Sequence, residues 1–511
     1  MLLSLLIFLP LVGVLFIAFT PAKAVSLQRG IALLTTLVVA VLSLTVWGTA
    51  DLTTLAVSKV WFTLPGTDVV VHYSLGVDGI SLFMMVLTGI LMPIVLLSTP
   101  GHIKERVKEF MIWVLVMQMG MMGVFLSTDL MLFYFFWEIG LVPLYFMVGI
   151  WGGQRRLYAT LKFFLYTFAG SVVMLIAAIA LIYRTGTTDI PALTEAMSAL
   201  GASETIWIFA AFTLAFAIKV PLLPFHTWLP DAHTEAPTSG SVILAGVLLK
   251  MGTYGLLRFS IAMFPAAAVA ASPWMMALGA IGIVYGAFLA MAQTDIKRLV
   301  ACSSVSHLGY VVLGLFALTH VGLAGGLIQM VNHGLSTGLL FLLVGMIYER
   351  RHTRQLDQYG GIASVMPVFA IFFTVAVLSS VGLPGLNGFV GEYLILLGSF
   401  QAMPFWSIIG VTGVIFGAIY LLMATRKMLY GPVVHEENRT LKDLNMREVG
   451  LMIPIVVLIV WIGVKPSYFM GRAEASIATI VQRLDAHRTG GKVATLELQA
   501  PVPAAKGGES R

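Results

Sequence analysis

Cysteine is almost absent from this sequence, because Cys302 is the only one in 511 residues. A single thiol cannot form a disulfide within the chain, and it cannot hold an iron–sulfur cluster whose ligands are all cysteines. The sequence also lacks the G-x-x-x-x-G-K-[ST] loop that binds phosphates and the G-x-G-x-x-G turn that binds dinucleotides. Any redox or nucleotide chemistry linked to this chain must therefore lie in partner proteins.

Charged residues are also scarce. They make up 11% of the sequence and hydrophobic residues 59%, whereas ordinary soluble domains have about 25% and about 45–50%. The hydrophobic excess lies in successive blocks of about twenty residues, the length that crosses a bilayer as a helix. These features exclude a soluble enzyme with one membrane anchor, and they predict an all-α polytopic membrane protein.

The alternation of apolar blocks and polar breaks predicts about 14 transmembrane helices. The first block, residues 1–19, lacks the basic segment of a secretory signal, so we expect a membrane helix there rather than a cleaved peptide. The predicted helices begin near Leu2, Ile31, Ile80, Phe110, Leu130, Leu161, Ile206, Ser239, Trp274, Leu299, Val321, Val365, Phe405 and Leu451.

Lys and Arg are distributed unevenly between the connections. The even-numbered connections contain three of them, Lys59, Arg184 and Arg258, whereas the odd-numbered ones contain seventeen. By the positive-inside rule the odd connections are cytoplasmic, which predicts a bacterial inner-membrane protein with a periplasmic amino terminus and a periplasmic tail. The formal charge of +6 therefore reflects membrane topology and indicates no nucleic-acid partner.

Several ionisable residues lie inside apolar blocks. A charge at mid-membrane costs about 2.5–3.5 kcal/mol on insertion scales, so such residues need partners and a function. A buried pair of Glu138 and Lys219 that only fixes helix packing is the alternative for those two residues. The candidate residues for proton transfer are Glu138, Lys219, Lys250, His307, His333 and Glu392. Ser303, Ser304 and Ser306 near His307 are expected to help hydrate a proton path.

Two of these charges adjoin helix breakers, a combination that indicates a transport site. Lys219 precedes Pro221 and Pro224, whose missing N–H groups leave the carbonyls of Ala217 and Val220 free. Glu392 follows a run rich in glycine and proline at residues 382–391. The sequence therefore predicts broken helices 7 and 12, which lie five helices apart and are consistent with two five-helix repeats of opposite orientation.

This organisation predicts five regions. They are residues 1–108 with three helices, 109–265 with helices 4–8, 266–430 with helices 9–13, 431–470 with a loop and helix 14, and the polar tail 471–511. In the tail, Ile477, Ile480, Val481 and Leu484 form one helical apolar stripe, which predicts a short interfacial helix followed by disorder.

One long motif carries a family resemblance: His226-Thr-Trp-Leu-Pro-Asp-Ala-His233-Thr-Glu-Ala-Pro-Thr-Ser-Gly-Ser-Val-Ile-Leu-Ala-Gly-Val-Leu-Leu-Lys250. It resembles the signature of the antiporter-like membrane subunits shared by respiratory complex I, Mrp-type cation/proton antiporters and membrane-bound hydrogenases. The similarity extends from the first helix to the fourteenth. Most relatives have a lysine on the broken twelfth helix, and Glu392 at that place resembles one subunit type of complex I.

The resemblance implies a proton-translocating membrane subunit of NADH:quinone oxidoreductase, an enzyme complex whose redox chemistry occurs in other subunits. It implies Glu138 as the partner of Lys219 on the input side, Lys250 with His307 and His333 as a central relay, and Glu392 as the terminal proton site. It also implies partner subunits that carry FMN, iron–sulfur clusters, NADH and quinone, with neighbouring antiporter-like subunits and membrane lipids as contacts.

Other interpretations remain open at this point. An Mrp-type sodium/proton antiporter subunit would use an ion gradient in place of electron transfer, and a solitary secondary transporter would need no partners. A haem held by His307 and His333 has no further support in the sequence. His226 and His233 as metal ligands have a seven-residue spacing that is unusual for zinc. We assign no chemistry to Asp129, Lys162 and Arg258, which lie near predicted membrane surfaces.

The uneven loop charges generate a topological prediction. A reporter fused after Arg511 should be accessible from the periplasm, because an even number of crossings returns the chain to the side on which it began. Accessibility can be measured by labelling intact cells with a membrane-impermeant thiol reagent. Labelling only after the cells are opened would show that the topology is inverted.

Overall fold

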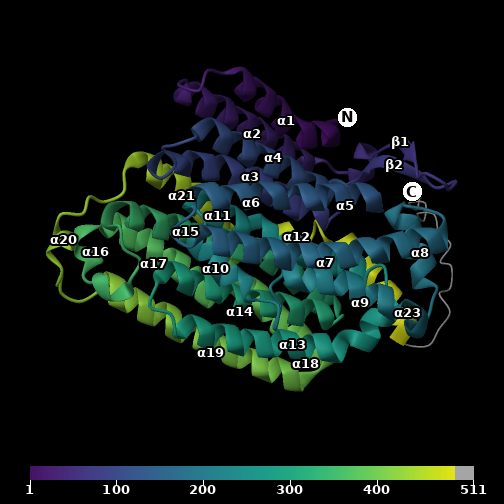
Figure 1. The fold of residues 1–511 in the computed structure, drawn as a ribbon. Helices are drawn as coiled ribbons and strands as arrows, with labels where there is room; N and C mark the ends of the chain where they lie inside the picture. The colour runs from purple at the N-terminus through teal and green to yellow at the C-terminus, as the bar shows by residue number, and fades with distance from the viewer. Residues whose placement is uncertain (489–511) are drawn as a thin grey trace, which may run out of the picture.

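The structure, a computed structural model, describes residues 1–488. Most of its long helices run roughly along one axis (Figure 1). Thirteen helical segments in this part are long and apolar enough to cross a membrane. The pair α17 (Pro367–Val381) and α18 (Asn387–Ala402) supplies one further, broken span. The prediction of a largely helical multi-pass membrane protein is therefore confirmed. The predicted disorder of residues 489–511 lies outside the described residues.

The first part of the chain contains four membrane helices. Its elements are α1 (Leu2–Phe19), α2 (Val25–Gly48), η1 (Leu52–Leu55), β1 (Val57–Thr63), β2 (Val70–Leu75), α3 (Ser81–Ser98), η2 (Thr99–Gly101) and α4 (Val107–Leu126). The strands form an antiparallel hairpin in which Val57 lies opposite Leu75 and Thr63 opposite Val70. The all-α prediction missed this hairpin, because a search for blocks of twenty apolar residues does not detect strands of six or seven.

The second part contains helices that are interrupted in several places. Its elements are α5 (Leu130–Ile139), α6 (Leu141–Trp151), α7 (Arg156–Thr185), α8 (Ile190–Ser198), α9 (Ala202–Lys219), α10 (Trp228–Glu235), α11 (Thr238–Ile243), η3 (Leu244–Leu248), α12 (Leu249–Gly255) and η4 (Leu256–Ile261). The predicted break after Lys219 is present between α9 and α10. A second break, between α5 and α6 at Gly140, was not predicted.

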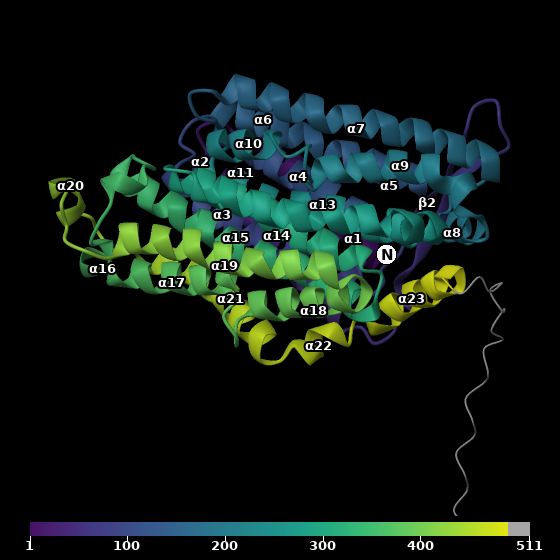
Figure 2. The ribbon, with the colours of Figure 1, turned by 90° about the horizontal axis from the view of Figure 1, so that it is seen from below.

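The remaining elements complete the membrane domain. They are α13 (Pro265–Met291), α14 (Ile296–Phe316), α15 (His320–Arg351), η5 (Leu356–Gln358), α16 (Ile362–Val365), α17, α18, α19 (Pro404–Leu429), α20 (Glu436–Arg439), α21 (Met446–Val464), α22 (Pro466–Met470) and α23 (Glu474–Arg488). The predicted helix near the end of the chain is α23, and its Ile477, Ile480 and Leu484 are buried. Figure 2 shows α7 at the upper edge of the molecule and α18 in the lower part, with α13 and α14 between them.

Burial divides the membrane helices into two classes. The most apolar windows of the segments Thr238–Ile261, Ile296–Phe316 and His320–Arg351 are 100% buried, whereas those of the outer helices α1, α2, α19 and α21 are 33% buried. The three fully buried segments carry Lys250, His307 and His333. The fold therefore holds these ionisable side chains at its centre and surrounds them with helices that face outward.

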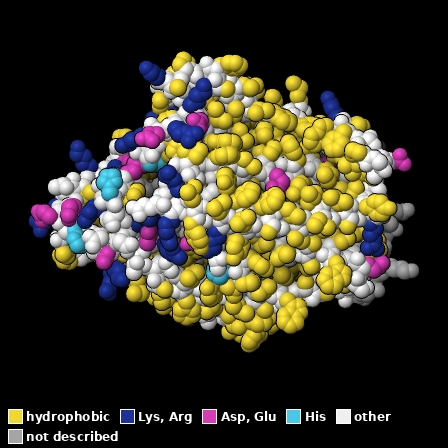
Figure 3. Space-filling view, in the orientation of Figure 1, with side chains coloured by type: hydrophobic (Ala, Val, Ile, Leu, Met, Phe, Trp, Pro, Cys, Tyr) yellow, Lys and Arg dark blue, Asp and Glu magenta, His cyan; other side chains and the backbone are white. Residues whose placement is uncertain are grey.

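The outer surface has a distinct charge pattern. Hydrophobic side chains cover most of the middle of the face shown in Figure 3, and Lys and Arg gather toward the end where α16 and α20 lie. We call this the basic end. The hairpin β1/β2, α8 and α23 lie at the opposite end (Figure 1).

Candidate functional site

Lys250 lies at the centre of the protein on a helix with irregular geometry. Its segment α12 is flanked by two π-helical turns, η3 and η4. Such turns change the backbone hydrogen-bond pattern, and they are frequent at functional sites. The ammonium group of Lys250, which is fully buried, donates to the carbonyl oxygen of Ala245 at the first π-helical turn. The local backbone thus supplies a polar partner for a cation that has no contact with solvent.

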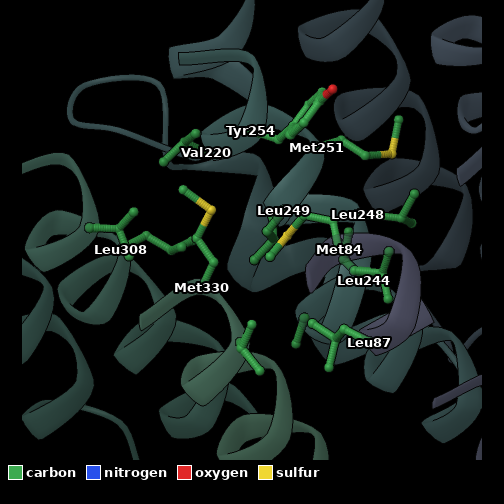
Figure 4. Packing of buried hydrophobic residues seen from close by; sticks show 14 of the residues in the cluster. Met84, Leu87, Val220, Leu244, Leu248, Leu249, Met251, Tyr254, Leu308 and Met330 are labelled. Carbon is green, nitrogen blue, oxygen red and sulfur yellow. The ribbon is translucent and has the colours of Figure 1, made fainter. Parts of the chain in front are cut away.

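Hydrophobic side chains pack around the segment that carries Lys250. Figure 4 shows its neighbours Leu248, Leu249 and Met251 packed with Leu244 and Met84 among others. All five side chains are buried. A charge in such a core must be satisfied by protein groups, because bulk water is excluded from it.

A line of titratable side chains continues from Lys250. Its Nζ lies 2.6 Å from Nδ1 of His333 on α15. The His333 ring lies beside the His307 ring, with 5.7 Å between centroids, and Nδ1 of His307 lies 3.4 Å from Oε1 of Glu392 on α18. All four side chains are buried. Lys250, His333, His307 and Glu392 thus form one sequence of neighbours across three helices and the broken twelfth span, and we call it the central row.

A polar network fixes the twelfth-helix break against α15. The Asn332 side-chain amide donates to the carbonyl of Asn387 at 2.7 Å. Ser379 donates to Oδ1 of Asn387 at 2.5 Å, and its hydroxyl also lies 2.8 Å from that of Ser336. These four side chains are buried. Because Asn332 precedes His333, the same contacts that hold the break also position the histidine.

Two glycines allow the chain at the twelfth-helix break to pack closely against the side chains of Glu392 and Gln329. Gly382 ends α17 with a φ of +81°, a left-handed conformation that other residues rarely adopt. A Cβ on Gly382 would lie 2.6 Å from Oε2 of Glu392, and a Cβ on Gly391 would overlap the side chain of Gln329. The glycine-rich run therefore turns the chain and also leaves space for the carboxylate, which the sequence pattern alone did not indicate.

The break after Lys219 is stabilised in a different way. The sequence predicted that prolines would free the carbonyl of Ala217, but that oxygen accepts from the backbone N–H of Leu222 at 2.9 Å. The indole N–H of Trp228, a fully buried residue on α10, donates to the carbonyl of Ile218 at 2.9 Å. A tryptophan from the long sequence motif therefore satisfies the broken backbone.

Lys219 and Glu138 are not in direct contact. The Nζ of Lys219 lies over the Trp137 ring, 5.2 Å from its centroid, and among the described residues it forms no ion pair with Glu138 within 4.0 Å. Glu138 lies just before the break at Gly140, with its carboxylate near the Tyr134 hydroxyl. The structure therefore brings the two charges near each other, with an aromatic ring beside the lysine, and it does not form the direct packing pair that was the alternative interpretation.

Glu138 also lines an apolar groove on the outside of the helices. The groove has a volume of about 480 Å³, and Trp61 and Phe62 of the β hairpin contribute to its wall together with Phe135 and Val142. Phe135 is 46% exposed. A carboxylate at the edge of such a groove is only partly shielded from its surroundings.

The structure adds two buried polar residues that the sequence did not single out for proton transfer. His233 on α10 is fully buried, its ring stacks on that of Phe341 at 4.6 Å, and neither of its nitrogens has a hydrogen-bond partner among the described residues. It interacts electrostatically with Lys250. Gln118 on α4 is also fully buried, and its amide group has no such partner. The sequence signal for His233 was its place in the long motif, and for Gln118 it was a single amide in an apolar span.

The serines near His307 are hydrogen-bonded to backbone carbonyls, and their expected part in hydrating a proton path stays a prediction. The hydroxyl groups of Ser303 and Ser304 donate to the carbonyl of Val300, and Ser306 donates to the carbonyl of Ile283. Their protons are therefore committed to the backbone. Within residues 1–488, no three His, Cys, Asp or Glu side chains are grouped so that they could hold a metal ion, and this includes the pair His226 and His233.

A polar cavity lies at the carboxyl end of the helical segment Thr238–Ile261, which also carries Lys250. It has a volume of about 340 Å³ and is lined by Tyr254, Arg258 and Asp78, with Arg483 contributed by α23. Arg258 and Asp78 form an ion pair at 2.6 Å. Burial alone would raise the pKa of Asp78, but the guanidinium of Arg258 outweighs it and holds that pKa below its usual range. Arg258, to which we assigned no chemistry, therefore anchors the end of the segment that carries Lys250.

Known proteins with similar sequences agree with this geometry. The family model described as NADH:quinone oxidoreductase/Mrp antiporter, TM, matches residues 127–417. NADH-quinone oxidoreductase subunit M of Rhodobacter capsulatus is 46% identical over 81% of this chain and 83% of the relative. The protein of the same name from Rickettsia prowazekii is 39% identical over 94% of this chain and 98% of the relative.

A solved structure extends the likeness to the fold. One chain in respiratory complex I from Thermus thermophilus with bound NADH is 31% identical, with a TM-score of 0.86 over 95% of this chain and 100% of that chain. The matched family region, the curated relatives and this structure together cover all the helices that carry the candidate residues. The chain therefore belongs to the NADH:quinone oxidoreductase/Mrp antiporter transmembrane family, in its subunit M branch.

Proposed function

We propose that this chain is a proton-translocating membrane subunit of an NADH:quinone oxidoreductase, respiratory complex I. The observation that carries the proposal is the central row, in which Lys250, His333, His307 and Glu392 are successive neighbours inside an apolar core. Four ionisable groups at such depth are costly to bury, and ionisable residues inside a membrane protein typically mark an ion or proton pathway. The identity to subunit M relatives supports complex I as the assembly.

The two histidines are arranged for transfer through the ring. Nδ1 of His333 faces Lys250, and Nδ1 of His307 faces Glu392. The Nε2 atom of each ring has no hydrogen-bond partner among the described residues. A proton accepted at one nitrogen of an imidazole can leave from the other, since each ring nitrogen is either a donor or an acceptor. We assign the Nε2 atoms as the sites that exchange the proton between the rings.

Lys219 and Glu138 form the input side in this proposal. Burial disfavours the charged form of Lys219, whereas a carboxylate nearby favours it. Their interaction is electrostatic and not a direct contact, so a small movement of Glu138 changes the balance without breaking a hydrogen bond to the lysine. The unpredicted break at Gly140, two residues after Glu138, is a site where such movement can occur.

The driving energy must come from partner subunits. Moving one charge against about 150 mV costs roughly 3.5 kcal/mol before any pH gradient is added. We propose that redox subunits with FMN, iron–sulfur clusters, NADH and quinone supply it, and that neighbouring antiporter-like subunits and lipids surround this chain. Direct contact with a neighbouring subunit would shield the apolar groove beside Glu138.

We further propose that the protein lies in a bacterial inner membrane with its basic end in the cytoplasm and its amino terminus in the periplasm. The segments 109–265 and 266–430 are proposed as repeats of opposite orientation. The breaks that adjoin Lys219 and Glu392 support this division, because each interrupts a span beside a buried ionisable side chain. The segments 1–108, 431–470 and 471–511 then flank the two repeats.

Replacing Lys219 tests the input side. In Lys219→Ala we expect assembly to survive, while NADH-driven proton pumping falls by roughly tenfold or more, because losing a proton-transfer group commonly costs about 10²–10⁴ in rate. Glu138→Ala should show the same loss. The measurement is acidification of inverted membrane vesicles, scaled to the assembled complex.

Lys59→Ala is the matched control for that experiment, since Lys59 is exposed on the β hairpin. It should pump at the wild-type rate. If Lys219→Ala also pumped at the wild-type rate, the lysine would have only a structural role and the proposed input side would be wrong.

Glu392 tests the terminal site, because only an exchangeable group can replace it. Glu392→Lys should retain more pumping than Glu392→Gln or Glu392→Ala, with assembly preserved in all three. Full activity in the Gln variant would show that Glu392 carries no obligatory proton. The same vesicles tested with and without sodium separate the complex from an antiporter: pumping should require NADH and not sodium, whereas sodium/proton exchange without NADH would contradict the proposal.

A further inference from the structure

His102 occupies a contact between three helices at the basic end. It directly follows η2, where α3 ends, and its Nδ1 lies 3.1 Å from Oε1 of Glu349 in the last turns of α15. Its Nε2 lies 3.2 Å from Oγ of Ser239 in the first turn of α11. Both ring nitrogens are therefore engaged, one by an acid and the other by a hydroxyl group.

The three side chains form a gradient of exposure. Glu349 is 25% exposed and the His102 side chain 15%, whereas Ser239 is fully buried. A small cavity of about 10 Å³ adjoins His102 and Glu349, which is room for about one water molecule. Glu349, His102 and Ser239 therefore lead from the surface to the interior of the protein.

Ser239 and Glu349 lie on the two helical segments that carry Lys250 and His333 of the central row. Ser239 lies eleven residues before Lys250 on one helical segment, a distance of about 16 Å at 1.5 Å per residue. His233 on α10 adjoins this segment, since its carbonyl accepts from Ser241 at 3.1 Å and its ring interacts electrostatically with Lys250. Glu349 belongs to α15, the helix that carries His333. The contacts of His102 therefore lie at the basic end of the two helical segments that carry Lys250 and His333.

Gly101 makes the His102 contact possible. A Cβ at this position would overlap the carboxylate of Glu349, so the acid can approach the histidine only over a glycine. Gly101 has no positive φ, which means that its conformation does not require glycine. The close approach of Glu349 explains the glycine better than backbone geometry does.

Two other charged residues lie near His102, and the acidic one of them is already paired. Arg447 and Glu448 of α21 line the same cavity, and Glu448 accepts two hydrogen bonds from Arg350 at 2.7 and 3.0 Å. The described contacts thus leave Glu349 as the acid that faces His102 directly. The partial exposure of His102 and Glu349, 15% and 25%, gives both groups access to water for proton exchange.

We propose that His102, held between Glu349 and Ser239, loads protons from solution at the basic end into the path toward Lys250. A hydronium ion protonates the Glu349 carboxylate and leaves as water, and the carboxylic acid passes that proton to Nδ1 of His102. The imidazolium then gives its Nε2 proton to the Ser239 oxygen as the hydroxyl proton of Ser239 moves inward, so that the ring is neutral again. Only O–H and N–H bonds form and break, and no electrons move. This inference rests on the proton-translocation function proposed above.

A loading group is needed because free protons are rare. Even at a diffusion-limited rate constant of about 10¹⁰ M⁻¹s⁻¹, a site at about pH 8 receives only roughly 100 protons per second. Turnover numbers of enzymes extend to about 10³ per second. A surface carboxylate beside a histidine can hold protons between encounters, so the supply no longer depends on bulk proton concentration alone.

The test compares His102→Gln with wild type in inverted vesicles that carry the whole complex. Glutamine can keep the hydrogen bonds of His102 to Glu349 and Ser239, but it cannot carry a proton. NADH-driven pumping should match wild type at about pH 6 and fall by about tenfold per pH unit above about pH 8, since supply then follows proton concentration. Gly101→Ala, which displaces Glu349 and removes no ionisable group, should give the same pH dependence in milder form.

Two controls separate proton loading from a structural clamp. His435→Gln changes an exposed histidine of the same end, which contacts a backbone carbonyl, and should follow wild type at every pH. Imidazole added to His102→Ala should restore pumping at high pH, because the small base can occupy the space of the ring. A loss that is equal at all pH values and is not restored by imidazole would show a clamp and overturn the proposal.

Lys219→Ala in the same series keeps the two proposals distinguishable. Wild-type pH dependence in His102→Gln together with lost pumping in Lys219→Ala would overturn proton loading at His102 and leave the proposed function intact. Wild-type pumping in both variants would overturn both. The expected result is that both variants lose pumping, and that the loss depends on pH only in His102→Gln.

Discussion

The ammonium group of Lys250 sets the constraint on which the rest of the structure depends. A cation without access to water needs polar partners from the protein, or it remains neutral. Here the partners are the carbonyl of Ala245, made available by a π-helical turn, and the His333 ring. The π-helical turns flank its segment, and the most apolar windows of α14 and α15, which carry His307 and His333, are buried. The polar network at the twelfth-helix break holds Asn332, the residue before His333. These features agree with the proposed proton relay.

The sequence predicted the features that arise from local chemistry. Blocks of apolar residues located the membrane helices to within a few residues for most of them, although α13 begins nine residues before the predicted start near Trp274. Proline and glycine located the breaks at Lys219 and before Glu392, because both residue types act on the backbone beside them. The six candidate residues came from the same reasoning, and the structure brings Lys250, His333, His307 and Glu392 together.

Features that depend on tertiary contacts were not predictable in this way. The β hairpin has strands of only seven and six residues, too short to resemble a span. The break at Gly140 is different, because Pro143 cannot donate to the carbonyl of Ile139, and the sequence therefore contained a signal for it that we did not use. The relation of Glu138 to Lys219 depends on where Trp137 points, and the serines near His307 find backbone carbonyls that only the fold supplies. His233 was visible only as part of a motif, since nothing in its neighbours indicates that both ring nitrogens lie buried without a protein partner.

His333 is the group whose loss tests the account most directly, because it contacts both Lys250 and the His307 ring. The decisive measurement is the rate of NADH-driven proton translocation per assembled complex in liposomes that contain His333→Gln. Glutamine can fill much of the space and accept a hydrogen bond, but it cannot accept a proton at one atom and release it from another. The account predicts a loss of roughly tenfold or more with assembly unchanged. Translocation at the wild-type rate would contradict it.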